Sequence, residues 1–398
     1  MRICMLSWEY PPRIVGGIAR HVEELSEALV SKGHEVHVIT ADHPNTPQYE
    51  LRKGVHIHRV PADNTPTPDF VTWIHHLNWG MAELALRLHQ AHPFDMVHAH
   101  DWLVAQSAVL LKKSFGVPLV GTIHATESGR NQGIHTSLQS YIHHQEWFLT
   151  YESYRVIVCS QYMYREVREL FAVPEDKLDI RPNGIDFHKF DFPFEQRQDF
   201  RRQFAMDHEK VVMFVGRMVP EKGAQVLIEA VPQILAHYPD AKFVVVGKGG
   251  FLPDLKRRAA ALRLGSKILF TGYVDDDTLL RIYRTADVAV APSLYEPFGI
   301  VALEGMAAKV PTVVADTGGL GEIIDHTRTG VTTYAGDPDS LAWGILQVLR
   351  HPREAGQMAE NAYQKVLDVF NWQVIADQTL STYDRVLEMS GRKEAAAR

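Results

Sequence analysis

Residues 293–312 read S-L-Y-E-P-F-G-I-V-A-L-E-G-M-A-A-K-V-P-T, and this stretch decides the fold that we expect. The run after Gly299 is typical of a helix that opens at a glycine, and a strand is predicted to follow at 311–315. Glu296 precedes the helix and Glu304, eight residues later, lies one to two turns inside it, since a turn takes about 3.6 residues. The first amides of a helix lack partners within it, and its dipole is positive there. The stretch therefore predicts an anion site flanked by two carboxylates, which suits a ligand with phosphate and hydroxyl groups.

Strands and helices alternate on both sides of this stretch. In the second half of the chain, short apolar runs predict strands at 211–216, 242–247, 267–271, 287–291 and 311–315. In the first half, the corresponding runs are 2–7, 34–40, 96–99, 117–124, 154–160 and 178–181. Segments of helical length separate the strands, so we expect two parallel sheets, each covered by helices on both faces.

The two series are separated by residues 186–206, where the periodicity is lost. We therefore expect an α/β protein with two Rossmann-like, doubly wound parallel-sheet domains, at 1–190 and 191–372. A C-terminal helix is predicted within 373–398, and packing back on the first domain is one option for it. Doubly wound domains bind ligands at the carboxyl ends of their strands, so the two domains are expected to face a cleft.

Composition excludes several classes of protein. The apolar fraction of 45% and the charged fraction of 22% are typical of a soluble globular protein. A formal net charge of -7 gives no reason to expect a nucleic-acid partner. Cys4 and Cys159 lie far apart in apolar runs and form no disulfide framework, which favours a cytoplasmic location. We expect no transmembrane segment, because no run approaches the roughly 18 apolar residues that one requires.

Two cations lie just after the first strand of the second half. In G-R-M-V-P-E-K-G (216–223), Arg217 follows the strand and Lys222 comes five residues later. The planar fork of arginine and the point charge of lysine together suit a diphosphate. The alternative is that both are surface cations, paired with Glu221 or hydrated.

Two glycine motifs also follow strands. Gly16-Gly17 stands at the first strand-to-helix turn, where bare backbone lets a phosphate or a sugar approach. The G-K-G-G motif at 247–250 resembles half of a dinucleotide fingerprint, but no third glycine opens a helix. We interpret it as a loop that approaches a nucleotide closely, and not as an NAD site.

Acidic and histidine motifs allow metal and non-metal interpretations. The D-D-D at 275–277 matches the D-x-D of some nucleotide-sugar enzymes, yet capping of the following helix is favoured. The H-A-H-D at 98–101 begins a dinuclear hydrolase pattern that the next two residues do not complete. Two of the polar residues of this motif could instead lie at a strand end and line the cleft. His124 follows another strand at the edge where α/β proteins bind ligands.

Together these motifs resemble the retaining glycosyltransferases of family 4, which have the GT-B architecture of two Rossmann-like domains. The resemblance covers nearly the whole chain and is carried, in the family's order, by Gly16-Gly17, His124, G-R-x4-K, E-x7-E and Gly318-Gly319. Within the family, V-H-A-H-D-W-L-V-A (97–105) and Y-E-P-F-G-I-V-A-L-E (295–304) are similar to bacterial glycogen-synthase-like α-1,4-glucosyltransferases. Ile18 departs from the leucine that is usual there.

The resemblance implies transfer of glucose from UDP-glucose or ADP-glucose to the non-reducing end of an α-1,4-glucan or oligosaccharide, without a metal or a cofactor. Retention is then expected by front-face transfer, with no covalent nucleophile. The resemblance places Arg217 and Lys222 on the diphosphate, and Glu296, His124 and Asp101 around the sugar. It also implies the donor-binding positions Gly16, Gly17, Gly249, Val274, Gly299, Ile300, Val301 and, on the ribose, Glu304.

Three alternatives remain open at this point. Another family 4 transferase could pass glucose, mannose or N-acetylglucosamine to a lipid or small-molecule acceptor, because acceptor contacts come from variable loops such as 61–69 and 128–136. A non-catalytic sugar-nucleotide-binding protein is a second interpretation, against which the complete set of site residues argues. A metal hydrolase built on His98 and His100 is a third, and a chelator would inactivate it.

Overall fold

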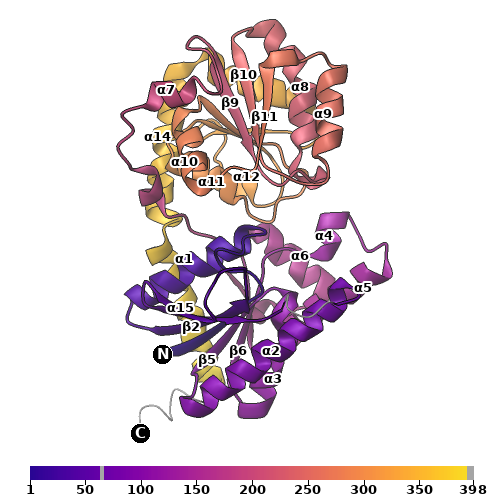
Figure 1. The fold of residues 1–398 in the computed structure, drawn as a ribbon, viewed down its shortest axis with the longest axis vertical. Helices are drawn as coiled ribbons and strands as arrows, with labels where there is room; N and C mark the ends of the chain where they lie inside the picture. The colour runs from indigo at the N-terminus through magenta and orange to yellow at the C-terminus, as the bar shows by residue number, and fades with distance from the viewer. Residues whose placement is uncertain (63–66, 392–398) are drawn as a thin grey trace. The chain divides into compact units, whose positions relative to one another are not determined.

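The computed structural model describes residues 1–62 and 67–391. Two compact units are present, each described by itself below (Figure 1). The first unit comprises Met1–Gly184 and the chain from Trp372 onward, and the second comprises Ile185–Asn371. The C-terminal helix therefore belongs to the first unit and does not form a separate domain. Residues 392–398 of the predicted C-terminal segment, and residues 63–66 of the predicted acceptor loop 61–69, lie outside the described residues.

The first unit is built on an eight-stranded sheet in the order β3-β4-β2-β1-β5-β6-β7-β8. All neighbouring strands are parallel except β3 and β4. The strands are Arg2–Ser7 (β1), Glu35–Ala41 (β2), Tyr49–Arg52 (β3), Val55–Val60 (β4), Met96–His100 (β5), Leu119–Ile123 (β6), Arg155–Val158 (β7) and Leu178–Ile180 (β8).

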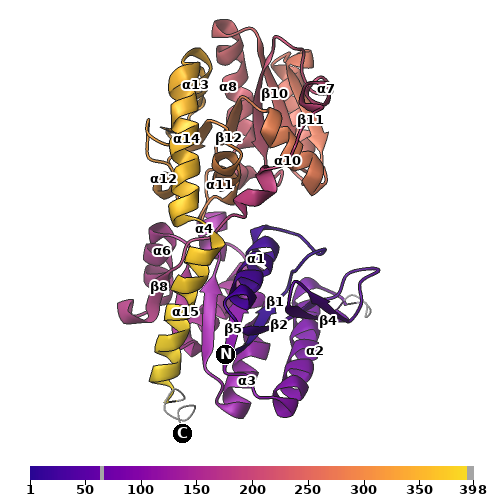
Figure 2. The ribbon, with the colours of Figure 1, turned by 90° about the vertical axis from the view of Figure 1, so that its left-hand side faces the viewer.

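Helices cover both faces of this sheet (Figure 2). On one face, apolar side chains of α1 and α15 form a buried core with β1, β2 and β4. The opposite face is covered by α2, α3 and α5, which contact one another in sequence. The helices are Gly17–Ser31 (α1), Phe70–Ala91 (α2), Ala105–Phe115 (α3), Glu127–Asn131 (α4), Ser137–Glu152 (α5), Gln161–Phe171 (α6) and Trp372–Met389 (α15).

The antiparallel hairpin β3–β4 was not predicted. Its turn residues Lys53 and Gly54 both have positive φ, 48° and 82°, as a two-residue turn between right-twisted strands requires. The alternating pattern V-H-I-H-R-V of β4 carries the signal, but histidines occupy positions where apolar residues are usual. The short edge strand β14 was missed as well.

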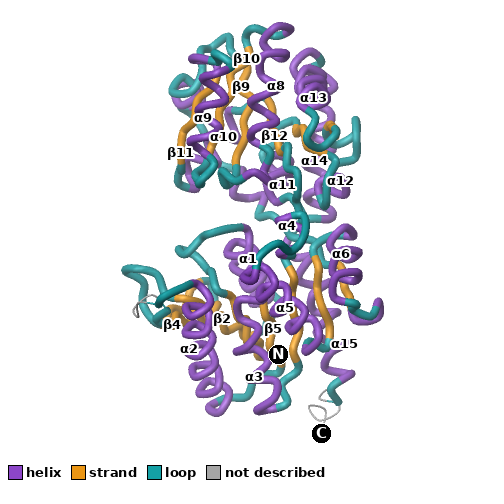
Figure 3. Tube along the Cα trace, turned by 90° about the vertical axis from the view of Figure 1, so that its right-hand side faces the viewer, coloured by secondary structure: helices purple, strands orange, loops and turns teal. Residues whose placement is uncertain are grey.

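The second unit is built on a six-stranded parallel sheet in the order β11-β10-β9-β12-β13-β14. The strands are Lys210–Val215 (β9), Ala241–Val246 (β10), Ile268–Gly272 (β11), Val288–Ala291 (β12), Thr312–Ala315 (β13) and Val331–Thr333 (β14). Figure 3 shows helices on both sides of it. They are Arg197–Arg201 (α7), Ala224–His237 (α8), Leu252–Ala261 (α9), Asp276–Thr285 (α10), Ile300–Ala307 (α11), Leu320–Ile323 (α12), Pro338–Arg350 (α13) and Pro352–Val369 (α14).

The strand orders fix where each unit can bind a ligand. In the first unit the chain leaves β1 toward β2 and later returns on the other side through β5. In the second unit the same reversal separates β9 from β12. Crevices form at such switch points, beyond the carboxyl ends of the strands. Among the described residues, no helix combines the length and apolarity required to cross a membrane.

Candidate functional site

The loops that follow β9 and β12 are tied together in the second unit. The backbone oxygen of Glu221 accepts hydrogen bonds from the amides of residues 294–295 at 2.8 and 3.3 Å. Lys222 Nζ donates to Glu296 Oε2 at 2.7 Å, and Ser293 Oγ donates to the same oxygen at 3.1 Å. Because Glu296 is only 7% exposed, water screens this ion pair weakly. The structure thus brings two predicted site residues, Lys222 and Glu296, into direct contact.

Two glycines allow the backbones of these loops to approach. Gly223 has a φ of 72°, and a Cβ there would lie 1.8 Å from the backbone oxygen of Pro292. Gly318 has a φ of 53°, and a Cβ there would lie 1.9 Å from the backbone oxygen of Glu296. The amide of Gly319 donates to that same oxygen at 2.9 Å. Hydrogen bonds from neighbouring residues therefore fix both the backbone and the carboxylate of Glu296.

The helix α11 begins directly after Gly299, as the sequence predicts. Gly299 is its N-cap, with a φ of 115°, and Ile300 and Val301 provide amides of the first turn. Glu304 is buried, and its Oε2 accepts a hydrogen bond from the hydroxyl of Tyr283 at 2.7 Å. Tyr283 lies on α10 and was not predicted, since a tyrosine in an amphipathic helix resembles any core residue. The two glutamates of the opening stretch therefore have different partners.

Arg217 lies in the loop after β9, and half of its side chain is exposed. Its guanidinium lies 3.6 Å from the carboxylate of Glu221, which is the pairing considered as the alternative to a ligand role. An exposed, weakly paired guanidinium can turn toward an anion at small cost, because surface pairs of this kind contribute little. The geometry is compatible with either role.

Backbone packing explains the presence of Gly249 in the loop after β10, which the sequence did not reveal. A Cβ at Gly249 would lie 2.4 Å from the backbone oxygen of Met218. The glycine is thus required by the protein's own backbone, whether or not a nucleotide approaches. Val274 follows β11 next to Tyr273, whose exposed ring lies 4.8 Å from Lys248 Nζ.

In the first unit, Asp101 follows β5 and holds the loop after β6. Its φ of 64° and ψ of 170° are rare for a residue other than glycine, and such a conformation costs about 1–3 kcal/mol. The carboxyl group is buried, and Oδ1 accepts the amide of His124 at 2.8 Å. Burial raises the pKa of Asp101 to about 6. Asp101 thus binds the backbone of the loop, a role that the sequence analysis did not foresee.

Three histidines meet beside that loop. His124 Nε2 lies 3.2 Å from His100 Nδ1, and the ring of His21, on α1, packs edge-on against His124 with 4.7 Å between centroids. His21 Nδ1 pairs with Asn183 Oδ1 at 2.7 Å. Burial lowers the pKa of all three histidines, that of His124 to about 3. They are therefore neutral near pH 7 and can serve as hydrogen-bonding groups.

The histidine arrangement bears on the hydrolase alternative. Ring nitrogens of His21, His100 and His124 lie within 4.8 Å of one another, a grouping from which a metal could be held. The hydrolase alternative, however, required His98. Both ring nitrogens of His98 are engaged, by the Tyr383 hydroxyl and by Thr122 Oγ1, each at 2.7 Å. His98 therefore links α15 to the sheet and is no free ligand.

The first glycine of the early pair is bound by a carboxylate from its own loop. Glu9 Oε2 accepts the amides of Val15 at 2.6 Å and of Gly16 at 2.9 Å. Glu9 is buried and was not predicted, because an acid two residues after a strand has no distinctive spacing. Gly17 is the first residue of α1, and Gly16 is its N-cap.

Glu146 is another buried acid that sequence reasoning missed. It lies on α5, and its Oε1 accepts the amide of Glu127 at 2.8 Å. Burial raises the pKa of Glu146 to about 9, so the carboxyl group is protonated near pH 7. The positive charge of Arg130, on α4, acts against burial and lowers the pKa of both Glu146 and Asp101.

The acidic run at 275–277 caps a helix, as favoured. Asp275 is the N-cap of α10, and its Oδ1 accepts the amide of Thr278 at 2.7 Å. Such a cap satisfies an amide that the helix itself cannot.

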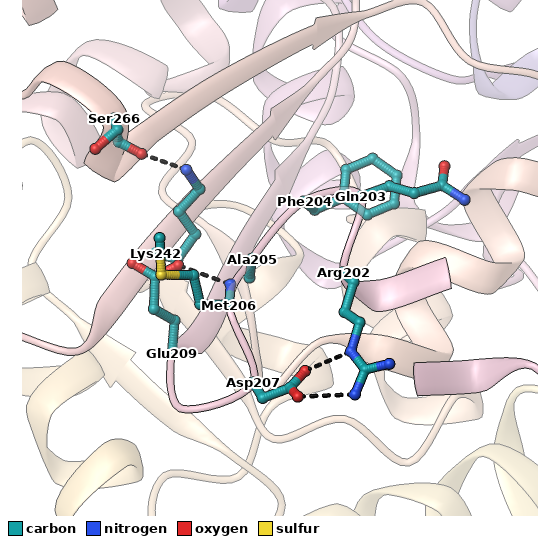
Figure 4. Close-up of a pocket in the computed structure, with 9 residues that line it drawn as sticks. All are labelled: Arg202, Gln203, Phe204, Ala205, Met206, Asp207, Glu209, Lys242 and Ser266. Carbon is teal, nitrogen blue, oxygen red and sulfur yellow. Dashed lines mark hydrogen bonds and ion pairs between the residues drawn. The ribbon is translucent and has the colours of Figure 1, made fainter. Parts of the chain in front are cut away.

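One hollow in the second unit lies away from these loops. It has a volume of about 450 Å³ and lies beside the N-terminal ends of β9 and β10 (Figure 4). Lys222, in contrast, follows the carboxyl end of β9. Its charges are already paired: Arg202 donates to both oxygens of Asp207 at 2.9 and 2.8 Å, and Lys242 donates to the backbone oxygen of Ser266. This hollow does not belong to the candidate site.

The chain matches known proteins over almost its whole length. Residues 15–189 match the family described as Glycosyltransferase Family 4, and residues 195–365 match Glycosyl transferases group 1. An uncharacterized glycosyltransferase of Methanocaldococcus jannaschii is 41% identical over 395 residues, which are 98% of this chain and 100% of that protein. The chain belongs to the family 4 glycosyltransferases. The family predicted from the sequence is thereby confirmed.

Two further comparisons concern this transferase. A glycogen synthase of Mycobacterium tuberculosis is 36% identical over 404 residues, covering 96% of this chain and 94% of that protein. The solved sucrose-phosphate synthase of Thermosynechococcus elongatus has a TM-score of 0.82 at 24% identity and covers 98% of this chain and 99% of its own. The structural likeness confirms the predicted GT-B fold class with its two parallel-sheet domains.

Proposed function

We propose that this transferase moves glucose from UDP-glucose or ADP-glucose to the non-reducing end of an α-1,4-glucan, with retention and without a metal. The observation that carries the choice of substrate is the 36% identity with a glycogen synthase over nearly the full length of both chains. Two buried free thiols, Cys4 and Cys159, are in keeping with a reducing cytoplasm.

The second unit would bind the donor. Lys222 uses one of three ammonium donors on Glu296, which leaves two for the diphosphate. Arg217 would add a planar fork, and the first-turn amides of Ile300 and Val301 would add a partial positive charge. Positive charge that is fixed before the reaction stabilises a leaving diphosphate without a metal ion. Glu304 would accept hydrogen bonds from the ribose hydroxyls.

The first unit would contribute to binding of the transferred sugar. His124 is neutral near pH 7, so it would donate or accept a hydrogen bond at a sugar hydroxyl and would not serve as a cationic acid. Asp101 would act mainly through the backbone of the loop that carries His124. In the proposed front-face transfer, the acceptor hydroxyl gives its proton to the leaving phosphate, and no protein nucleophile is required.

The stereochemical outcome and the chelator response test this proposal together. With UDP-glucose or ADP-glucose and maltotetraose, we expect the new glucosidic linkage to be α by proton NMR coupling. Transfer should continue at an unchanged rate after EDTA treatment and gel filtration. A β linkage, or a rate that EDTA abolishes and added metal restores, would contradict the proposed mechanism.

A further inference from the structure

The loop 124–127, which carries His124, is held by acidic side chains from three separate elements. Asp101, at the end of β5, accepts the amide of His124 at 2.8 Å. Glu146, on α5, accepts the amide of Glu127 at 2.8 Å. The buried Thr126 donates its hydroxyl to Glu166, on α6, at 2.6 Å. Both ends of the loop are therefore fixed from the body of the first unit.

Burial of the Glu146 side chain costs folding free energy. The side chain is fully buried, and its Oε2 has no hydrogen-bond partner within the described residues. An unpartnered buried polar atom costs about 1–3 kcal/mol, whereas an apolar side chain of similar size would be stabilising there. Stability alone does not explain a glutamate at this place. The hydrogen bond that it accepts from the amide of Glu127 is the feature that an apolar residue would lose.

We propose that Glu146 is a positioning residue for glycosyl transfer, which fixes the loop 124–127 and thereby the imidazole of His124. The residue itself would touch neither the donor nor the acceptor. It would act as a neutral carbonyl acceptor, since burial favours the protonated carboxyl group. The inference rests on the proposed role of His124, so one of its tests is independent of activity.

The first test compares three variants at Glu146. Glu146→Gln keeps a carbonyl oxygen at the same reach, Glu146→Asp shortens the reach, and Glu146→Ala removes the acceptor. We expect kcat on the order of 10²-fold lower for the Asp and Ala variants, because a small displacement of a site residue has effects of this size. The donor KM should change less than threefold, and Glu146→Gln should retain at least half of the wild-type kcat.

Glu152→Ala is the matched control. Glu152 lies on the same helix and is also buried, but its carboxylate is engaged by Lys112 and Lys113, each at 2.9 Å, and not by a loop amide. Its loss should lower the melting temperature and leave kcat within twofold. A Gln variant as poor as the Ala variant, or Asp and Ala variants with wild-type kcat, would overturn the proposal. If Glu146→Ala does not fold, the Gln and Asp variants still decide.

The second test is amide hydrogen exchange of the full chain, followed by mass spectrometry. Peptides that cover 124–131 should exchange at least tenfold faster in Glu146→Asp than in wild type, and at the wild-type rate in Glu146→Gln and Glu152→Ala. Unchanged exchange in Glu146→Asp would overturn the proposal even if activity fell. A wild-type protein without glucosyltransferase activity would refute the proposed function, while this measurement would still decide whether Glu146 fixes the loop.

Discussion

Lys222 Nζ lies 2.7 Å from Glu296 Oε2, and the two residues stand on loops that follow the adjacent strands β9 and β12. Because the two strands are neighbours in the sheet, the loops that follow them bring the ammonium group of Lys222 close to the carboxylate of Glu296. Two ammonium protons of Lys222 remain for a further anion. This relationship, within the second unit alone, is the physical basis of the proposed donor site.

Removing either member of this pair should disable transfer without unfolding the protein. We expect Lys222→Ala and Glu296→Ala each to lower kcat by about 10²-fold or more, because loss of one preorganised charge at a reacting group has effects of that size. For Lys222→Ala, the expected loss of unfolding free energy is about 1–3 kcal/mol, since the carboxylate of Glu296 that remains is buried. Steady-state kinetics and thermal unfolding measure the two effects.

Lys267→Ala provides the control for that pair. Lys267 Nζ pairs with Glu209 Oε1 at 2.9 Å, and Glu209 is buried to a similar degree as Glu296. This pair lies at the N-terminal end of β9, whereas Lys222 follows the carboxyl end of that strand. Its loss should reduce stability and leave turnover unchanged. Near-wild-type activity of both site variants would show that the assigned site is wrong.

Gly318 should be intolerant of any side chain. Gly318→Ala would place a Cβ 1.9 Å from the backbone oxygen of Glu296 and would force a residue with positive φ to carry a side chain. We expect a loss of activity together with a loss of stability of more than about 1 kcal/mol. Gly356→Ala, on an exposed face of α14 with open space around it, should instead stabilise the protein by about 0.5–1 kcal/mol. Equal effects of the two changes would contradict the assigned role of Gly318.

The protonated carboxyl group of Glu146 should make stability depend on pH. The unfolded chain releases this proton near the ordinary glutamate pKa of 4.5, and burial raises the pKa in the folded chain to about 9, so between these values the folded state binds more protons. Stability contributed by this group therefore falls as pH rises through that window. Because glutamine does not ionise, the stability of Glu146→Gln relative to wild type should increase with pH, by at most about 1.4 kcal/mol per pH unit. Denaturant unfolding at several pH values measures this difference, and a constant difference would mean that Glu146 is ionised in the folded state.

Buried histidines should have the opposite effect at acidic pH. Burial lowers the pKa of His37 and of His58 from 6.5 to about 4. Between these values the unfolded chain binds more protons, so stability is lost as pH falls through the window. His58→Gln should make this loss shallower, which acid unfolding followed by circular dichroism can test. An unchanged slope would show that His58 titrates normally in the folded state.

The sequence predicted the parts of this molecule that depend on short-range patterns. Apolar runs located the central strands, and a glycine before an apolar segment located α11. The motifs around Lys222 and Glu296 have fixed spacing, and the structure places these two residues in contact. The fold class and the family followed from these local features.

Residues such as His21 and Glu146 could not be predicted in this way. Glu146 reaches an amide 19 positions away, and His21 pairs with Asn183, 162 positions away. Their local sequence is that of ordinary helices, so only the tertiary arrangement reveals their partners. Gly247 and Gly249 show the converse, since a motif suggestive of a ligand also serves the packing of the protein's own backbone.

A donor panel with a defined acceptor tests the central claim most directly. Wild-type protein would be incubated with maltotetraose and, separately, the UDP, ADP and GDP derivatives of glucose, mannose and N-acetylglucosamine, with nucleotide release and product mass both recorded. We predict release only from UDP-glucose or ADP-glucose, in step with a product ladder that grows by single glucose residues and is absent in Lys222→Ala. Release without longer glucans, or release from a donor of another sugar, would contradict the account.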